Sequence, residues 1–407
     1  MSISAKSVTL AIDGGKPTCS PIRDKWPIFE QDEIDSAVKV LQSGRVNYWT
    51  GEEGRSFERE FAEACGCAHA IALANGTVAL ELALRVLGIS AGDEVITTSR
   101  TFLASASCAV MVGAKPVLAD VDRASGNITA EAIEPLLTPR TRAIIAVHLA
   151  GWPCEMDSIM QLAKKNGLAV IEDCAQAHGA TYHGKPIGSI GDIGAFSFCQ
   201  DKIMTTAGEG GMLTTQDPDI WSKAWSLKDH GKSFDAVYNR RHPEGFRWLH
   251  ESFGTNWRLS EVQSAVGRVQ LRKARGWVEQ RRKIASRYNC SFAQLPGLRV
   301  EVPALELQHS YYRYYVYVRP ERLRAEWNRD RILRALNAEG VPTYSGTCSE
   351  IYLEKAFPRK WRPKARLTVA QELGETTIML PVFHTLDECQ ISGVCSAVEK
   401  VMMCATG

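Results

Sequence analysis

Short apolar runs alternate with longer amphipathic stretches through the first half of the chain. Five runs between Ala68 and Asp173 are apolar on both faces, as strands buried in a parallel sheet are; they are AIALA, EVITTS, KPVLADV, AIIAVHL and AVIED. Gly, Ser, Asn or Asp follows each run before the next helical stretch, which is typical of parallel strands joined by crossover helices. Two more runs, GAFSF and GGMLTT, continue the sheet. The pattern predicts an α/β fold whose mostly parallel central sheet is covered by helices.

Helical patterns flank the predicted sheet. Residues 29–65 contain two helices around the loop GRVNYWTGEEG, and another helix covers 218–230. A polar, aromatic-rich connection at 231–255 leads into one long helical pattern from RLSEV to FAQL. The remainder holds a strand in YYRYYVYV, a helix at about 329–339 and a closing helix in QISGVCSAVEKVM, which suits a small α+β domain. We therefore predict an N-terminal segment (1–28), a large domain (29–255) and a small C-terminal domain (256–407).

The charge balance excludes one class of partner. The 407 residues include 48 basic and 46 acidic side chains, a net charge of +2, which is too small to neutralise the phosphates of a nucleic acid. No apolar stretch approaches the roughly 20 residues that cross a bilayer. We therefore expect neither nucleic acid nor a membrane as a partner.

The cysteines indicate a cellular compartment. All twelve lie outside C-x-x-C pairs and zinc-type clusters. We interpret them as buried free thiols and expect no metal site. Because the chain starts without a charged-then-apolar leader, we expect a cytoplasmic protein in a reducing environment.

Candidate chemistry gathers around one lysine. Lys202 lies in a polar, Gly-rich loop that follows the strand GAFSF, and a lone loop lysine is most often merely solvated. Asp173, however, ends the strand AVIED, at the carboxyl edge of a parallel sheet where ligands bind in such folds. Gln176 and His178 follow it closely. We therefore expect polar and titratable side chains near this lysine, as a reactive amine requires.

A third element of this edge is the segment NGTVALELAL. A strand ends there, Gly76 and Thr77 turn, and an apolar helix begins. The free backbone N–H groups of a helix N-terminus, together with a hydroxyl group, make an anion site. An amine, a carboxylate and a phosphate seat are what pyridoxal 5'-phosphate requires: Asp173 would keep the pyridine nitrogen protonated, and Lys202, once displaced, would shuttle a proton.

Ten ordered blocks, spread over nearly the whole chain, carry a family resemblance. They are GGKP, SGRVNYWTG, NGTVALELAL, GDEVITTSRTFLASA, HLAGWPCEMD, VIEDCAQAHGA, GDIGAFSF with the lysine after it, GEGG, GTNWRLSEVQSAVGRVQL and LPVF. On these the chain resembles the DegT/DnrJ/EryC1/StrS family of sugar aminotransferases. The resemblance implies the aspartate-aminotransferase-like fold type I of pyridoxal-phosphate enzymes, with a large domain and a small C-terminal α+β domain.

The resemblance also implies a role for each residue around the cofactor ring. Lys202 would form the internal aldimine, and Asp173 would pair with the pyridine nitrogen. Gln176 would lie against the side of the ring that carries the phenolic oxygen, and Phe102 would stack on the ring. Phe102 could instead be a core residue, and Gln176 could instead form a hydrogen bond at the start of a helix.

The phosphate group would have its own set of residues. Gly76, Thr77 and Ser197 match the family's phosphate-binding positions, although Ser197 could be a tolerated strand hydroxyl. Asn256, in GTNWR, matches an asparagine that family members lend to the phosphate from the other subunit. A homodimer with shared sites follows from the resemblance.

Some positions stay open or depart from the family pattern. His148 and His178 could be structural or could line the site. Cys199 and Gln200 stand where family members commonly have His-Pro, and Ala207 replaces the usual glycine before GEGG. A related branch with histidine in place of the lysine is a dehydratase, so Lys202 favours amino transfer.

The reaction implied by the resemblance moves an amino group from L-glutamate to a keto sugar. The sugar is commonly a 4-keto-6-deoxy or 3-keto hexose on UDP, GDP or dTDP, for polysaccharide or natural-product biosynthesis. A keto-cyclitol or an aminobenzoate-type precursor is the nearest alternative acceptor, and a non-catalytic regulator that binds the cofactor is an alternative of another class. A dehydrogenase is disfavoured because no G-x-G-x-x-G follows the first strand. Arg240, Arg241 and Arg258 are available for a diphosphate, although each is interpreted first as a solvated surface charge.

Overall fold

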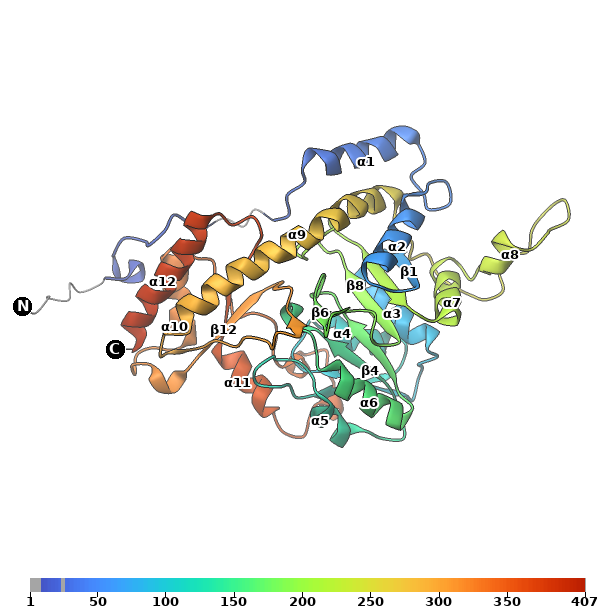
Figure 1. Cartoon of the computed structure of the whole chain (residues 1–407). Helices are drawn as coiled ribbons and strands as arrows, with labels where there is room; N and C mark the ends of the chain where they lie inside the picture. The colour runs from blue at the N-terminus through green and yellow to red at the C-terminus, as the bar shows by residue number, and fades with distance from the viewer. Residues whose placement is uncertain (1–8, 23–25, 407) are drawn as a thin grey trace, which may run out of the picture.

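A seven-stranded sheet forms the centre of the molecule (Figure 1). The computed structural model describes residues 9–22 and 26–406. In spatial order the strands are β1 (His69–Leu73), β9 (Gly211–Thr215), β8 (Ile193–Ser197), β5 (Ala169–Asp173), β4 (Thr141–Val147), β2 (Glu94–Thr98) and β3 (Lys115–Ala119). Of these seven strands, six run in the same direction and β9 runs in the opposite one. The predicted mostly parallel sheet is confirmed.

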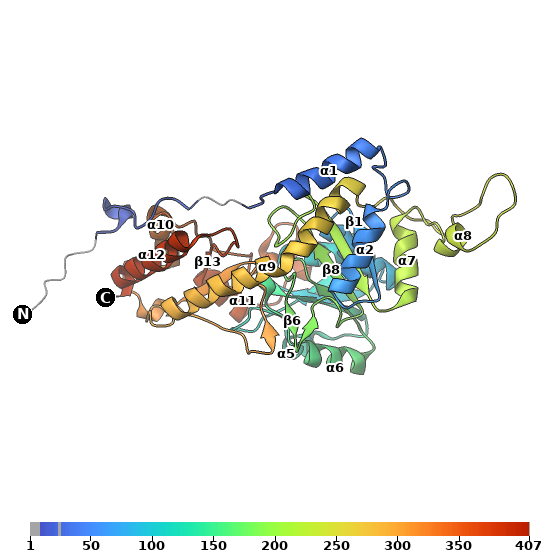
Figure 2. The same cartoon turned by 45° about the horizontal axis from the view of Figure 1, so that its top comes forward.

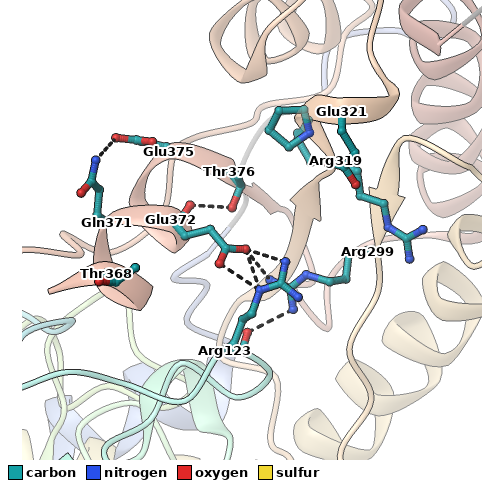
Figure 3. A pocket seen from close by; sticks show the side chains of 11 residues that line it. Arg123, Arg299, Arg319, Glu321, Thr368, Gln371, Glu372, Glu375 and Thr376 are labelled. Carbon is teal, nitrogen blue, oxygen red and sulfur yellow. Dashed lines mark hydrogen bonds and ion pairs between the residues drawn. The ribbon is translucent and has the colours of Figure 1, made fainter.

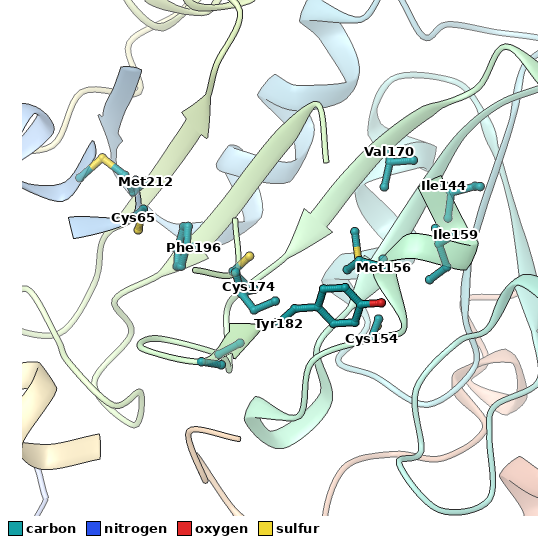
Figure 4. Close-up of a cluster of buried hydrophobic side chains, with 14 of the residues drawn as sticks. Cys65, Ile144, Cys154, Met156, Ile159, Val170, Cys174, Tyr182, Phe196 and Met212 are labelled. Atoms are coloured by element: carbon teal, nitrogen blue, oxygen red, sulfur yellow. The ribbon is translucent and has the colours of Figure 1, made fainter. Parts of the chain in front are cut away.

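Helices cover both faces of this sheet. On one face, Phe57 and Phe61 of α2 pack with Met156 and Ile159 of α6 against the strands; Figure 4 shows part of this cluster around Phe196. On the other face, the apolar residues of α3, α4 and α7 pack together against the strands. The helices are α2 (Glu53–Ala64), α3 (Gly76–Val86), α4 (Ala104–Met111), α5 (Ala130–Ile133), α6 (Met156–Asn166) and α7 (Pro218–Lys228). Burial on both faces explains why the strands read as continuous apolar runs.

One long helix, α9 (Glu261–Phe292), links the sheet to the rest of the chain. It begins at a capping box, in which Ser260 accepts from the backbone N–H of Gln263 and the Gln263 side chain accepts in return. Helix α1 (Gln31–Ser43) lies along the first part of α9 (Figures 1 and 2), and the second part packs with α12 (Glu388–Thr406). The helix therefore contributes side chains to the core beside the central sheet and to the second core, around the small sheet, that is described next.

A second core surrounds a small antiparallel sheet. Its strands are β10 (Leu298–Arg299), β12 (Tyr314–Val318) and β13 (Thr377–Leu380), and the helices α10 (Arg329–Ala338), α11 (Thr368–Thr376) and α12 accompany them. Three short strands form a third, minor sheet: β6 (Thr181–Tyr182), β7 (Lys185–Pro186) and β11 (Leu307–Gln308). Leu10, Ile22 and Trp26, from the expected N-terminal segment, pack into the second core. The domain boundaries at 28 and 255 stay predictions.

An arm extends from the body after α7. It holds the short helix α8 (Phe234–Tyr238), and the loop beyond this helix projects into solvent in both views (Figures 1 and 2). Phe246 and Trp248 contact each other and are 76% and 84% exposed, and Phe253 is fully exposed. Three exposed aromatic side chains on one arm are unusual for a free surface. Among the described residues, no helix is both long and apolar enough to span a bilayer.

Candidate active site

Three chain segments meet at the carboxyl edge of the central sheet. Asp173 ends β5, Ser197 ends β8, and Gly76 begins α3 directly after β1. Lys202 lies in the loop after β8, close enough to Asp173 for its charge to lower the pKa of that carboxyl. The topology therefore brings together residues that are widely separated along the chain.

The N-terminus of α3 forms a cradle for an anion. The Asn75 side chain caps the helix by accepting from the backbone N–H of Val78 at 3.0 Å. The N–H groups of Gly76 and Thr77 have no acceptor among the described residues. A Cβ added to Gly76 would lie 2.6 Å from Cβ of Ser197, so only glycine lets these two segments touch. Two free N–H groups and the Ser197 hydroxyl thus share one small space, which fits a phosphate group.

Asp173 is held in a fixed orientation inside the protein. One carboxylate oxygen, Oδ2, accepts from the Ser105 hydroxyl at 2.7 Å, and Oδ1 accepts from the backbone N–H of Ala175 at 3.1 Å. Burial raises the pKa of the carboxyl above its usual value, although the Ser105 hydrogen bond and the charge of Lys202 act against this. A protonated pyridine nitrogen would supply the opposite charge that a buried carboxylate favours.

Gln176 is oriented by an unusual backbone group. Its Oε1 accepts from the backbone N–H of Ala150 at 2.7 Å, and Ala150 has φ of +56°, in the left-handed region. The short segment of Ala150 is clamped in turn by Ser310, whose N–H donates to Gly151. With Oε1 engaged, the Nε2 group of Gln176 makes no hydrogen bond within the described chain, so it is free to donate to a ligand oxygen.

Lys202 is mostly enclosed. Its side chain is 16% exposed, and Nζ lies 3.5 Å from Oδ1 of Asp201. The indole N–H of Trp26 donates to the carbonyl oxygen of Lys202 at 2.7 Å, which fixes the loop. Burial acts to lower the pKa of the amine, but Tyr312 and Asp201 act more strongly, so its pKa is raised. In the same loop, Ala207 has φ of +61°, so the turn keeps the left-handed geometry that favours glycine.

Two expected site residues stand apart from this network. The Phe102 side chain is 70% exposed at the start of α4, which leaves its ring free to cover a ligand. Asn256 is exposed, forms a backbone bridge with Asp229, and makes no side-chain hydrogen bond among the described residues. Its neighbour Trp257 accepts from the N–H of Ala74, beside the α3 cradle.

The histidines left open by the sequence differ in role. His148 is structural: Nε2 pairs with Glu172 at 3.1 Å, and Nδ1 accepts from the N–H of Cys154. Glu172 also accepts from three backbone N–H groups, so the buried group formed with Cys174 has its lone pairs engaged and does not fit a metal. Both ring nitrogens of His178 are buried, and burial together with the nearby charge of Lys202 lowers its pKa to about 3. His178 therefore lines the lysine's surroundings as a neutral group.

Two of the three candidate diphosphate-binding arginines form ion pairs. Arg258 pairs with the buried Asp229 at 2.5 Å. Arg240 pairs with Asp235 and with Glu251 on the arm. Arg241 is exposed. The interpretation as a solvated charge thus fails for Arg258 because a buried carboxylate engages it.

A separate surface cavity of about 710 Å³ lies between α11 and the start of the small sheet (Figure 3). Arg123 forms two hydrogen bonds to the Glu372 carboxylate there, and Arg299 lies close by. None of the expected site residues lines this cavity. Because none of those residues lies there, the candidate active site remains at the sheet edge.

Sequence reasoning missed several contributors to the site. Ser105 reads as one small residue in an apolar helix, and the role of Ala150 belongs to its backbone. Asp201 reads as a solvated loop charge, and Tyr312 as part of a strand. The motifs HLAG and FLASA, which hold Ala150 and Ser105, were the available signal, because both lie among the family-like blocks.

The residues of this edge fit pyridoxal phosphate. The cradle that a Cβ would fill, the free N–H groups of α3 and the buried carboxylate of Asp173 match the phosphate and the ring nitrogen. A family model, the DegT/DnrJ/EryC1/StrS aminotransferase family, matches residues 27–399. The chain belongs to this family.

Related proteins agree with this family assignment. The UDP-N-acetyl-3-dehydro-α-D-glucosamine 3-aminotransferase of Acidithiobacillus ferrooxidans is 36% identical over 91% of this chain and 94% of its own length. The GDP-perosamine synthase of Caulobacter vibrioides is 39% identical over 93% of this chain and 97% of its own length. An aminotransferase crystal structure from Psychrobacter cryohalolentis has 53% identity and a TM-score of 0.93, and the match covers 94% of this chain and all of that one.

These matches establish the enzyme class. The chain is a sugar aminotransferase of fold type I, as its sequence blocks implied. The family consists of pyridoxal-phosphate-dependent aminotransferases.

Proposed function

We propose that this enzyme moves the amino group of L-glutamate to a keto sugar carried on a nucleoside diphosphate, with pyridoxal 5'-phosphate held by the residues named above. The observation that carries the proposal is the convergence of Lys202, Asp173 and the α3 cradle at one sheet edge. When bound, the cofactor supplies an electron sink for the carbon that gains or loses the amino group. The related proteins that act on UDP-linked and GDP-linked sugars support this substrate class.

Each residue has a distinct task in this reaction. Lys202 would supply the amine that holds the cofactor and, once released, would move a proton at the substrate carbon. Asp173 holds the proton on the ring nitrogen by its opposite charge. Gln176 would donate from Nε2 to the phenolic oxygen of the cofactor, and Phe102 would cover one face of its ring.

The phosphate group would be bound from two directions. The N–H groups of Gly76 and Thr77 and the hydroxyl of Ser197 contact it from within the subunit. Asn256 contacts it from a second subunit of a homodimer. The exposed aromatic residues Phe246, Trp248 and Phe253 support such an assembly, because docking on a second copy would cover the arm.

The cellular location is part of the same proposal. All twelve cysteines are free thiols in the structure. Unpaired cysteines in this number are typical of a reducing compartment, so we place the enzyme in the cytoplasm.

The first test follows the visible absorption of the cofactor. Purified protein loaded with pyridoxal phosphate should be yellow, and L-glutamate should bleach this band while 2-oxoglutarate is released. Lys202→Ala should lack the band. If the wild-type band ignores L-glutamate, the protein uses another amino donor or binds the cofactor without catalysis.

A second test identifies the acceptor. The amino form of the enzyme is mixed in turn with keto sugars on UDP, GDP and dTDP, a keto-cyclitol and an aminobenzoate precursor. Return of the yellow band with one nucleotide sugar supports the proposal. Return only with the cyclitol or the aminobenzoate precursor would favour the alternative acceptor.

A further inference from the structure

The carboxylate next to the reactive lysine is shared by groups from two parts of the fold. Oδ1 of Asp201 lies 3.5 Å from Nζ of Lys202. Oδ2 accepts a short hydrogen bond from the Tyr312 hydroxyl and lies 3.3 Å from Nη2 of Arg313. Tyr312 and Arg313 directly precede β12 of the small sheet. Tyr312 is buried, with 5% of its surface exposed, and Arg313 is partly exposed. Asp201 thus joins the lysine loop to the second core.

Two cations meet this single carboxylate. Nζ of Lys202 lies 5.0 Å from the centre of the Tyr312 ring, and the Arg313 guanidinium lies 4.5 Å from the same centre. The side chains of Lys202 and Arg313 are only 16% and 18% exposed. Without Asp201, two enclosed positive charges would share one aromatic ring, and no other carboxylate among the described residues forms an ion pair with either of them, an arrangement that costs free energy.

The other groups around Lys202 do not replace Asp201. Asp173 is engaged by Ser105 and Ala175. His178 is neutral near physiological pH. Cys199 is a thiol whose pKa is raised by burial and by Glu209 and Asp201. Among the described residues, the titratable and charged groups near Lys202 and the Asp201 carboxylate include Cys199, Asp173, His178, Tyr312 and Arg313.

We propose that Asp201 is a positioning residue that holds the amine of Lys202, as an ammonium, whenever this amine is not bonded to the cofactor, and that Tyr312 and Arg313 fix Asp201 for this task. The inference rests on the proposed function of Lys202. To bond, the ammonium would give up one proton to solvent and its nitrogen would attack the aldehyde carbon; the aldehyde oxygen would then leave as water with the two remaining hydrogens of the amine as a carbon–nitrogen double bond replaces the carbon–oxygen one. Asp201 therefore sets the pH at which the lysine becomes available and keeps the released amine beside the reacting carbon.

The sign of the effect follows from the charges. A carboxylate near an ammonium stabilises the protonated form, and removing it makes the amine lose its proton at lower pH. In Asp201→Asn, the pH midpoint for covalent attachment of pyridoxal phosphate should fall by about one unit. Below that midpoint, attachment should become up to roughly tenfold faster than in the wild type.

The experiment uses full-length apoprotein mixed with pyridoxal phosphate across a pH series. Borohydride reduction traps the attached cofactor, and mass spectrometry of the Lys202 peptide gives the initial rate of attachment. Asp201→Glu keeps the carboxylate and should show the wild-type pH midpoint of attachment. Tyr312→Phe should lower this midpoint, as Asp201→Asn does, but by a smaller amount. Glu209→Gln, which removes an exposed carboxylate from the same loop, is the matched control and should leave the midpoint unchanged.

The outcomes separate the inference from the proposed function. No attachment in the wild type, or equal attachment to Lys202→Ala, would overturn the role of Lys202 itself. Attachment that requires Lys202 but keeps one midpoint in wild type, Asp201→Asn and Glu209→Gln would overturn only the role of Asp201. Circular dichroism of each variant shows that the fold is retained, and Asp201→Glu tests the role again if Asp201→Asn fails to fold.

Discussion

The Ser105 hydroxyl donates to Oδ2 of Asp173 at 2.7 Å and so fixes the carboxylate that would face the pyridine nitrogen. A hydrogen bond to a charged group contributes about 1.5–3 kcal/mol. Ser105→Ala should therefore raise the dissociation constant of pyridoxal phosphate by roughly tenfold or more. Equilibrium dialysis against the free cofactor measures this constant.

Ser107→Ala is the matched control for that prediction. Ser107 lies on the same helix, and its side chain makes no hydrogen bond within the described residues. Equal affinity in Ser105→Ala and Ser107→Ala would show that the Asp173 carboxylate needs no such support.

Gly76→Ala should close the phosphate cradle. The new methyl group would lie 2.6 Å from Cβ of Ser197, so the end of β8 or the start of α3 must shift. We expect cofactor affinity to fall by at least about tenfold and the protein to lose roughly 1–3 kcal/mol of stability. Cofactor titration and denaturant unfolding measure the two effects.

Gly276→Ala provides the comparison for the cradle. Gly276 lies in α9, and a Cβ there meets open space. This variant should bind the cofactor normally and gain up to about 1 kcal/mol in helix stability. A Gly76→Ala protein with unchanged cofactor affinity would argue against a phosphate seat at α3.

Much of the fold could be predicted because the strands bury both faces. The run AVIED matches β5 residue for residue, and the long helical pattern gives α9 within a few residues at each end. Helix α11 and strand β13 were missed. The helix ends at Thr376 and the strand begins at Thr377, with no turn residue between them. The sequence therefore shows no break where the hydrophobic pattern of a helix changes to that of a strand.

The motifs in the sequence could suggest only those site residues that would do the covalent chemistry. Lys202 and Asp173 stand in family-like blocks; Asp173 ends β5, Lys202 lies in the loop after β8, and their roles stay predictions. Asp201 and Tyr312 meet although 111 positions separate them. Nothing local distinguishes Asp201 from a solvated loop carboxylate, because its environment is created by tertiary packing. The same reason hides Ser105 and the backbone N–H of Ala150.

Mixing two inactive variants tests whether Asn256 acts across a dimer. Lys202→Ala subunits have an intact Asn256, and Asn256→Ala subunits have an intact Lys202. If Asn256 serves the partner's site, each mixed dimer contains one complete site and one incomplete site. About half of the dimers formed by refolding the two variants together are mixed, so refolding should restore up to about a quarter of wild-type cofactor loading. Absence of any restoration, with mixed dimers demonstrated by mass, would place Asn256 in its own subunit's site.

Stability should fall as the pH falls below neutrality. Burial and nearby positive charge lower the pKa of His178 and His309 to about 3 in the folded protein, whereas an unfolded imidazole titrates near 6.5. The unfolded state thus binds more protons between these values, and each residue costs about 2 kcal/mol of unfolding free energy at pH 5. Denaturant unfolding at pH 7 and pH 5 measures the loss.

A pair of variants assigns this loss to a buried ring. His309→Gln should reduce the drop between pH 7 and pH 5 by about 2 kcal/mol. Substitution of the exposed His250 by Gln should leave the drop unchanged. The same drop in both variants would show that His309 does not resist protonation.

The most direct test of the central claim follows the nitrogen atom itself. The enzyme with pyridoxal phosphate is incubated with L-glutamate labelled with heavy nitrogen and with the keto-sugar nucleotide that restores the yellow band, and the sugar product is analysed by mass spectrometry. We predict one heavy nitrogen on the sugar, an equal amount of 2-oxoglutarate, and neither product with Lys202→Ala. An unlabelled or unchanged sugar from wild-type enzyme would contradict the assignment as a sugar-nucleotide aminotransferase that uses L-glutamate.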